Sequence, residues 1–145
     1  MDVAVPANLR CGQPDQTMAM AQEPSWAPLS YTFGGIWEIQ PVALEECIAG
    51  GRGHEVQVID VREPAEFSGD LGHIPGARLV PLAQLAARSG EIDKTLPVVT
   101  VCRSGARSAQ ATVLLQKSGF TQVANLAGGM LRWRAEALRS EQGGN

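Results

Sequence analysis

The sequence lacks an uninterrupted apolar run of about 18 residues, the length that a membrane-spanning helix requires. Its N-terminus also lacks the basic region and apolar core of a secretory signal. Basic residues are not in excess, since the formal net charge is −3, whereas domains that bind nucleic acids are usually basic. We therefore expect neither a membrane nor a nucleic acid as a partner.

Residues that bind metals are also scarce. The chain has two histidines and three cysteines, Cys11, Cys47 and Cys102. No two of the cysteines have the short spacing of a metal site, so we expect no metal and no cofactor. The odd cysteine count and the absence of a secretory signal favour a reducing, cytoplasmic setting with free thiols.

The composition is that of one globular domain. Of the 145 residues, 44% are hydrophobic and 19% are charged, but only 5% are aromatic, so the core must consist mainly of aliphatic side chains. Residues 1–35 are rich in Pro, Ala, Gln and Gly and show no lasting periodicity. We interpret them as a flexible or loosely packed N-terminal extension, followed by a domain over residues 36–139 and a tail over residues 140–145.

Short apolar runs alternate with helical patterns from residue 36 onward. The runs predict strands over residues 36–40, 56–61, 77–80, 98–102 and 123–126. The helical patterns predict helices from Pro41 onward and over residues 64–67, 82–87, 108–117 and 130–138. This alternation predicts an α/β fold with a mainly parallel sheet of roughly five strands and helices on both faces. Ligands of such sheets bind beyond the carboxyl ends of the strands.

Cys102 stands where a reactive cysteine would be expected. It ends the most β-branched strand pattern, and a turn through Gly105 leads from it into a helix. A thiolate there would accept hydrogen bonds from backbone N–H groups, lie near the positive end of the helix dipole and have Arg103 and Arg107 in the same turn. Each effect lowers the pKa of a cysteine. A lone cysteine is usually only a small buried hydrophobe, but this combination favours a nucleophile.

Four separated motifs carry a family resemblance. Residues 36–139 resemble the single-domain rhodaneses, or thiosulfate sulfurtransferases, and residues 1–35 fall outside the resemblance. It implies the three-layer α/β/α rhodanese fold. The motifs are Ile59-Asp60-Val61-Arg62 with Pro64, Glu66 and Phe67; Gly72-His73-Ile74-Pro75-Gly76-Ala77; Cys102-Arg103-Ser104-Gly105-Ala106-Arg107-Ser108; and Gly128-Gly129-Met130-Leu131-Arg132-Trp133.

The resemblance implies a ping-pong transfer of sulfur. Cys102 would be the nucleophile and would take the outer sulfur of an anionic donor such as thiosulfate as a persulfide. A thiophilic acceptor, either cyanide or a thiol, would then remove it, and a protein that donates or accepts a persulfide is a further partner that the resemblance allows. The donor or the carried sulfur would be bound by the loop residues Arg103, Ser104, Gly105, Ala106, Arg107 and Ser108. For Arg107, two roles stay open, attraction of the donor and bracing of the loop.

The remaining motif residues are expected to support the fold. Asp60 and Arg62 are predicted to form a buried or half-buried ion-pair network with Glu66, since buried charges must be paired. His73 is interpreted as a hydrogen-bonded residue in the turn before the third strand, and Trp133 as part of the core.

Two other functions fit parts of this pattern. Phosphatases and arsenate reductases use a similar Cys…Arg loop, but the phosphatases have one residue more between the two than the four present here. The shorter loop should crowd a phosphoryl group. A non-catalytic binding or regulatory module with the same fold is the second alternative, although such modules usually lack the cysteine.

Overall fold

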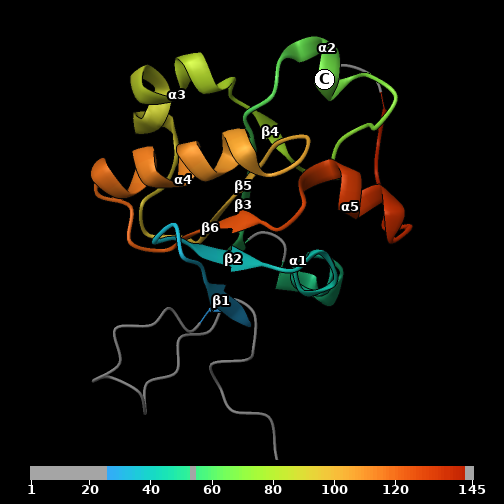
Figure 1. The fold of residues 1–145 in the computed structure, drawn as a ribbon, viewed down its shortest axis with the longest axis horizontal. Coiled ribbons are helices and arrows are strands. Elements are labelled where there is room, and N and C mark those ends of the chain that lie inside the picture. Colours follow the sequence, from blue (N-terminus) through green and yellow to red (C-terminus); the bar gives the residue numbers. More distant parts are fainter. Residues whose placement is uncertain (1–25, 53–54, 143–145) are drawn as a thin grey trace, which may run out of the picture.

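The computed structural model describes residues 26–52 and 55–142, which form a six-stranded sheet in the order β1-β2-β6-β5-β3-β4 (Figure 1). All neighbouring strands are parallel except β1 and β2. This confirms the α/β class and the mainly parallel sheet, with one strand more than expected. The strands are β1 (Leu29–Tyr31), β2 (Trp37–Ile39), β3 (Gln57–Asp60), β4 (Arg78–Leu79), β5 (Val98–Val101) and β6 (Val123–Leu126).

The additional strand, β1, falls within the predicted N-terminal extension. Leu29–Tyr31 pairs with β2, and the Trp26 side chain just before it is buried. The Tyr31 ring packs edge-on against Trp37, whereas Phe33 is exposed. The part of the predicted extension up to residue 25 lies outside the described residues, and the domain boundary at residue 36 stays a prediction.

The helices lie close to the predicted positions. They are α1 (Pro41–Cys47), continued by the π-helical turn η3 (Ile48–Arg52), α2 (Pro64–Phe67), α3 (Leu82–Arg88) with the 3-10 turn η5 (Ser89–Glu91), α4 (Ala106–Lys117) and α5 (Gly129–Ala135). Proline occupies the first position of α1 and α2, where its missing N–H costs no helical hydrogen bond. The expected helix over residues 130–138 is wrong at its end, because α5 stops at Ala135.

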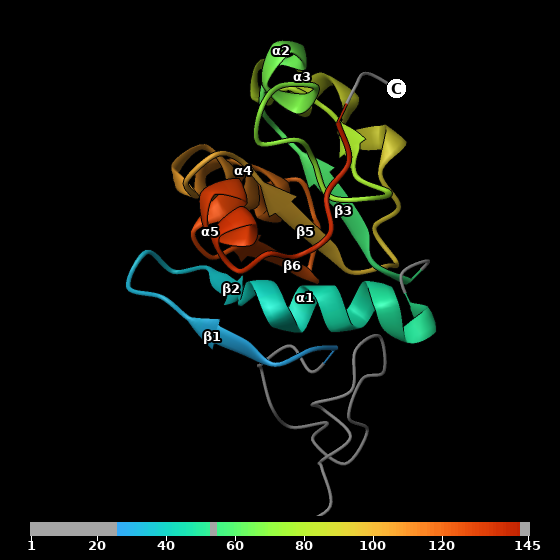
Figure 2. The same cartoon turned by 90° about the vertical axis from the view of Figure 1, so that its right-hand side faces the viewer.

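Two hydrophobic layers enclose the sheet. α3 and α4 pack on one face, and α1 and α5 lie on the other, nearer the viewer in Figure 2. Alternation along β5 assigns its residues to the two layers, because successive side chains of a strand point to opposite faces. Val98 belongs to the layer of α3 and α4, together with Cys102, whereas Val99 and Val101 belong to the other.

Two observations concern the absences expected from the sequence. Among the residues that the structure describes, no helix has the length and apolar character needed to cross a membrane. In the same residues no group of three or more His, Cys, Asp or Glu side chains could hold a metal ion.

Cys47, buried at the end of α1, is disulfide-bonded, which corrects the expectation of free thiols at this residue.

A buried ion pair ties the end of β3 to the segment that follows it. Arg62 Nη2 lies 2.7 Å from Asp60 Oδ2, and the Arg62 Nε donates to Asp60 Oδ1 at 2.8 Å. The same guanidinium donates to the carbonyl oxygens of Glu66 at 3.2 Å and Gly72 at 2.7 Å. Because both side chains are at most 1% exposed, each charge depends on the other for compensation.

Replacing Arg62 with alanine should therefore destabilise the protein strongly. The change leaves the Asp60 carboxylate buried without its counter-charge, and we expect a loss of about 3–5 kcal/mol in the free energy of unfolding. Urea denaturation followed by circular dichroism measures it. The matched control is Arg88→Ala, which removes an exposed pair with Glu91 and should change the unfolding midpoint little. Equal effects of the two substitutions would refute the importance of the buried pair.

Candidate active site

Cys102 lies at the carboxyl end of β5, in the loop that leads into α4. Gly105 precedes the helix with φ 110°, a left-handed conformation that favours glycine. This turn starts α4 at Ala106 rather than at residue 108 as expected. Cys102 is only 1% exposed, whereas Arg103, Ser104 and Ala106 around it are exposed. The sulfur thus lies directly beneath the surface of the loop.

The start of α5 fixes the orientation of this loop. The N–H groups of Met130 and Leu131 donate to the carbonyl oxygens of Cys102 at 2.9 Å and of Arg103 at 3.0 Å. A Cβ atom at Gly129 would lie 2.5 Å from the Arg103 oxygen and 2.6 Å from that of Cys102, so this approach requires glycine. With these carbonyl groups turned toward α5, the amides that follow are left to face the sulfur.

Hydrogen-bond donors converge on the sulfur as the sequence predicts. The Gly105 N–H donates to Cys102 Sγ at 3.0 Å, and Ser108 Oγ lies 3.3 Å from it. Burial raises the pKa of the Cys102 thiol, but hydrogen bonds from the Ser108 side chain and from the backbone of Ser108, Gly105 and Ser104 outweigh it and lower the pKa from its ordinary value. The loop therefore favours the nucleophilic thiolate.

The two loop arginines have different surroundings. Both terminal nitrogens of Arg107 donate to the Glu66 carboxylate, each at 2.8 Å, in a bidentate pair. This hydrogen bonding lowers the pKa of Glu66 from 4.5 to about 2, against the opposing effect of burial. Glu66 thus contacts Arg62 with its backbone and Arg107 with its carboxylate. Arg103 makes no side-chain hydrogen bond or ion pair within the described part of the chain.

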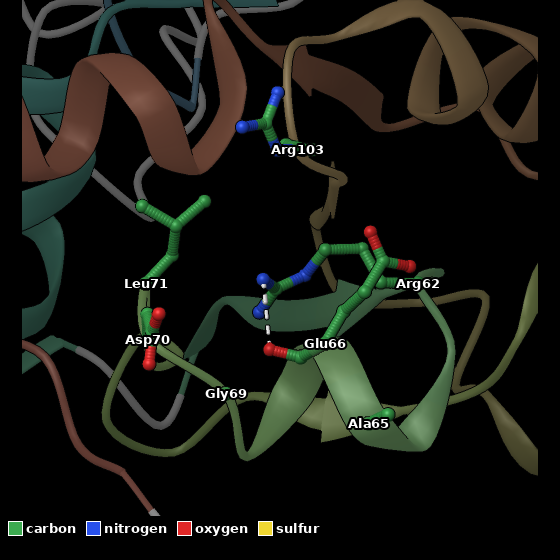
Figure 3. Close-up of a pocket in the computed structure, with 7 residues that line it drawn as sticks. All are labelled: Arg62, Ala65, Glu66, Gly69, Asp70, Leu71 and Arg103. Carbon is green, nitrogen blue, oxygen red and sulfur yellow. Dashed lines mark hydrogen bonds between the residues drawn. The ribbon is translucent and has the colours of Figure 1, made fainter.

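A cavity of about 330 Å³ opens beside the loop (Figure 3). Arg103 lies on one side of it, and the segment after α2 with Asp70 and Leu71 lies across from it. The remaining lining comes from Arg62, Ala65, Glu66 and Gly69. Since the charge of Arg107 is compensated by Glu66, Arg103 is the cation that an anion in this cavity would meet.

Two of the supporting residues predicted from the motifs, His73 and Trp133, are buried. His73 Nδ1 lies 2.9 Å from the Phe67 carbonyl oxygen, so this nitrogen carries the proton, and its ring stacks on Phe67. Trp133 is fully buried, and its indole N–H donates to the Arg139 carbonyl oxygen at 2.7 Å.

Sequence reasoning missed two residues behind the loop, Asn125 of β6 and Glu38 of β2. Ser108 Oγ lies 2.5 Å from Asn125 Oδ1, and Asn125 Nδ2 donates to Glu38 Oε2 at 3.1 Å. A signal was present in the sequence: Asn125 interrupts the buried apolar strand Val123–Leu126, and a buried amide needs hydrogen-bond partners. The sequence did not show which partners these would be.

Comparisons with known proteins find a family model, related sequences and similar structures. Residues 44–136 match the model of the rhodanese-like domain. The chain is 42% identical over 101 residues to a protein of Allochromatium vinosum named sulfurtransferase, which covers 70% of this chain and 91% of that protein. It is 34% identical over 84 residues to the thiosulfate sulfurtransferase GlpE of Pseudomonas aeruginosa, with coverages of 58% and 74%. A rhodanese-like domain protein of Staphylococcus aureus is a structural neighbour with a TM-score of 0.62 and 29% identity, covering 72% of this chain and 97% of that one.

The Glu66–Arg107 pair predicts a pH-dependent contribution to stability. The lowered pKa of Glu66 means that the pair stabilises the folded state above pH 4.5 and that this contribution is lost as the pH falls toward about 2. Glu66→Gln should therefore be less stable than the parent at pH 7. The difference in stability between the two proteins should shrink as the pH falls from 4.5 to about 2. Denaturant midpoints across the pH range measure it, with the exposed Glu46→Gln as the control. A difference that stays constant down to pH 2 would contradict the pairing.

Proposed function

The chain belongs to the rhodanese-like domain family, and from this premise we propose that it is a sulfurtransferase that carries a sulfane sulfur as a persulfide on Cys102. The donor is thiosulfate or a persulfide, and the acceptor is a thiophile such as cyanide or a thiol. One observation carries the proposal above all: Cys102 is a free thiol whose pKa is lowered by hydrogen bonds from its own loop.

The loading step follows from the chemistry of a thiolate. Cys102 Sγ attacks the outer sulfur of thiosulfate, a bond forms between these two sulfurs, and sulfite leaves with the electron pair of the broken sulfur–sulfur bond. No proton has to move, so no general base is needed once the thiol is ionised. In the second step the acceptor attacks the outer sulfur, and the Cys102 thiolate is restored as the leaving group.

Three features favour sulfur transfer over phosphoryl transfer. Four residues separate Cys102 from Arg107, one fewer than in the phosphatases with a similar loop, and this leaves less room for a phosphoryl group. The Arg107 guanidinium is already held at both terminal nitrogens by Glu66, which makes it a brace for the loop. The name of the Pseudomonas aeruginosa relative, thiosulfate sulfurtransferase, points the same way.

The cavity beside Arg103 is the proposed approach for the donor. Its volume of about 330 Å³ exceeds what a small anion needs, and its free cation would attract one. Since Cys102 is 1% exposed, the loop residues from Arg103 to Ala106 must shift during loading to bring donor and sulfur into contact. A persulfide-bearing protein could reach the same loop from outside.

The cytoplasmic location stays a prediction.

Replacing Cys102 with serine should abolish sulfur transfer, because an alkoxide does not form at neutral pH and a serine cannot carry a sulfane sulfur. Thiocyanate formation from thiosulfate and cyanide measures the activity. Mass spectrometry of the thiosulfate-treated parent should show one added sulfur on the peptide that contains Cys102, and none in the variant. A non-catalytic module would show no added sulfur in either protein with any persulfide donor, and transfer that persists in the variant would exclude Cys102 as the carrier.

Replacing Arg103 with alanine should raise the KM for thiosulfate roughly fivefold, since an exposed charge interaction contributes up to about 1 kcal/mol. The effect should diminish as the ionic strength rises, because salt screens exposed charges. Arg103→Lys, which keeps the charge, should retain most of the parent affinity. An unchanged KM in the alanine variant at low salt would mean that Arg103 does not attract the donor.

A further inference from the structure

A line of four side chains runs from Cys102 through Ser108 to Asn125 and Glu38, and the proposed function does not use the last two. Cys102 Sγ lies 3.3 Å from Ser108 Oγ, which lies 2.5 Å from Asn125 Oδ1, and Asn125 Nδ2 lies 3.1 Å from Glu38 Oε2. We infer that Glu38 is a positioning residue for Cys102: acting through Asn125, it weakens the hydrogen bond that the Ser108 hydroxyl donates to the sulfur. The inference concerns the same site as the proposed function but does not depend on sulfur transfer.

The orientation of the Asn125 amide is fixed by its neighbours. Its Nδ2 faces the Glu38 carboxylate at 3.1 Å and the Gly105 carbonyl oxygen at 3.3 Å. An ionised carboxylate and a carbonyl oxygen only accept hydrogen bonds, so the amide NH₂ must face them. The carbonyl end of the amide, Oδ1, is therefore turned toward Ser108.

Ser108 has one hydroxyl proton and two acceptors for it. Ser108 Oγ lies within hydrogen-bond distance of Asn125 Oδ1, and Ser108 must be the donor because Asn125 Oδ1 has no proton to give. The Cys102 sulfur, at 3.3 Å, competes for the same proton. Both Ser108 and Asn125 are at most 2% exposed, so water does not relieve the competition. Glu38 favours the hydrogen bond from Ser108 to Asn125 over the one from Ser108 to the sulfur. The closest donor to the sulfur is then the Gly105 N–H, at 3.0 Å.

This bias has unequal effects on the two states of the proposed cycle. In the free enzyme the negative charge is on Sγ, which would gain from the Ser108 proton. In the persulfide the charge is on the outer sulfur, and Sγ is neutral and gains little. Withholding the proton therefore disfavours the thiolate relative to the persulfide. It also leaves the thiolate more nucleophilic, because the nucleophilicity of a thiolate rises with its pKa.

The test is the isosteric substitution Glu38→Gln. A glutamine at position 38 can donate as well as accept, so only the Gly105 carbonyl oxygen, at 3.3 Å, still holds the Asn125 amide in its orientation, and Ser108 becomes freer to donate to Sγ. The apparent pKa of Cys102 should fall by roughly one unit, as expected for a hydrogen bond to a charged group. It is measured as the pH dependence of iodoacetamide alkylation at the Cys102 peptide by mass spectrometry. No sulfur donor is involved, so the result is independent of the proposed function.

A double-mutant cycle separates this effect from the loss of a negative charge. If Glu38 acts through the Ser108 proton, Glu38→Gln should leave the pKa of Cys102 unchanged in a Ser108→Ala background. If it acts through its field alone, the shift should be the same in both backgrounds, which would overturn the inference. Glu46→Gln removes an equal charge from the exposed side of α1 and should change nothing.

Asn125→Ala provides a second variant. It removes Oδ1 and should also lower the pKa of Cys102, whereas a merely structural role of Asn125 would loosen the loop and raise it. A rise in either single variant, or no change in Glu38→Gln, would overturn the inference. The other charged groups around the sulfur are the same in every protein compared: Arg103, the pair Arg107–Glu66 and the pair Arg62–Asp60.

Discussion

The site depends on which way the peptide groups of one short loop face. A buried sulfur keeps a negative charge only if N–H groups point at it, and N–H groups point inward only if the neighbouring carbonyl groups have partners elsewhere. The first two N–H groups after Gly129 provide those partners for Cys102 and Arg103. The anion-stabilising loop after β5 is therefore held by a helix that begins some 27 residues later in the chain.

The surrounding polar groups then divide into two sets with different tasks. On the outer side, both terminal nitrogens of Arg107 donate to the carboxylate of Glu66 on α2, while Arg103 makes no ion pair within the described residues. On the inner side, Thr100 and Thr112 donate to the Ser108 carbonyl oxygen at 3.0 and 2.9 Å. These contacts fix the first turn of α4 and place the Ser108 hydroxyl between the sulfur and Asn125. Under the proposed function the outer set would act on what approaches the sulfur, and under the further inference the inner set would act on the basicity of the sulfur.

Much of this arrangement could be predicted because it is local. The helix Pro64–Phe67 and the strand Val123–Leu126 follow from apolar periodicity and from proline at a helix start, and both match the structure. The Cys102 loop could be recognised because its cysteine, glycine and helix start are adjacent in sequence.

β1 escaped prediction because three residues, Leu-Ser-Tyr, are too few to show a period within a segment rich in proline and glycine. The partners of polar side chains also escaped: Glu66 and Arg107 are 41 positions apart, and Glu38 and Asn125 are 87 apart. Which polar groups meet over such separations depends on the strand order, which periodicity does not supply.

The bidentate pair of Glu66 and Arg107 has a consequence for how substitutions could change the charge beside the loop. While this pair is intact, the cavity beside the loop is lined by Asp70 and by one arginine, Arg103, that forms no ion pair within the described residues. A neutral residue at position 66 would release a second guanidinium beside the first and shift the balance toward dianions. Under the proposed function, the preference for one donor over another would thereby be adjustable at a position on α2 outside the loop, without altering Cys102 or the amides around it.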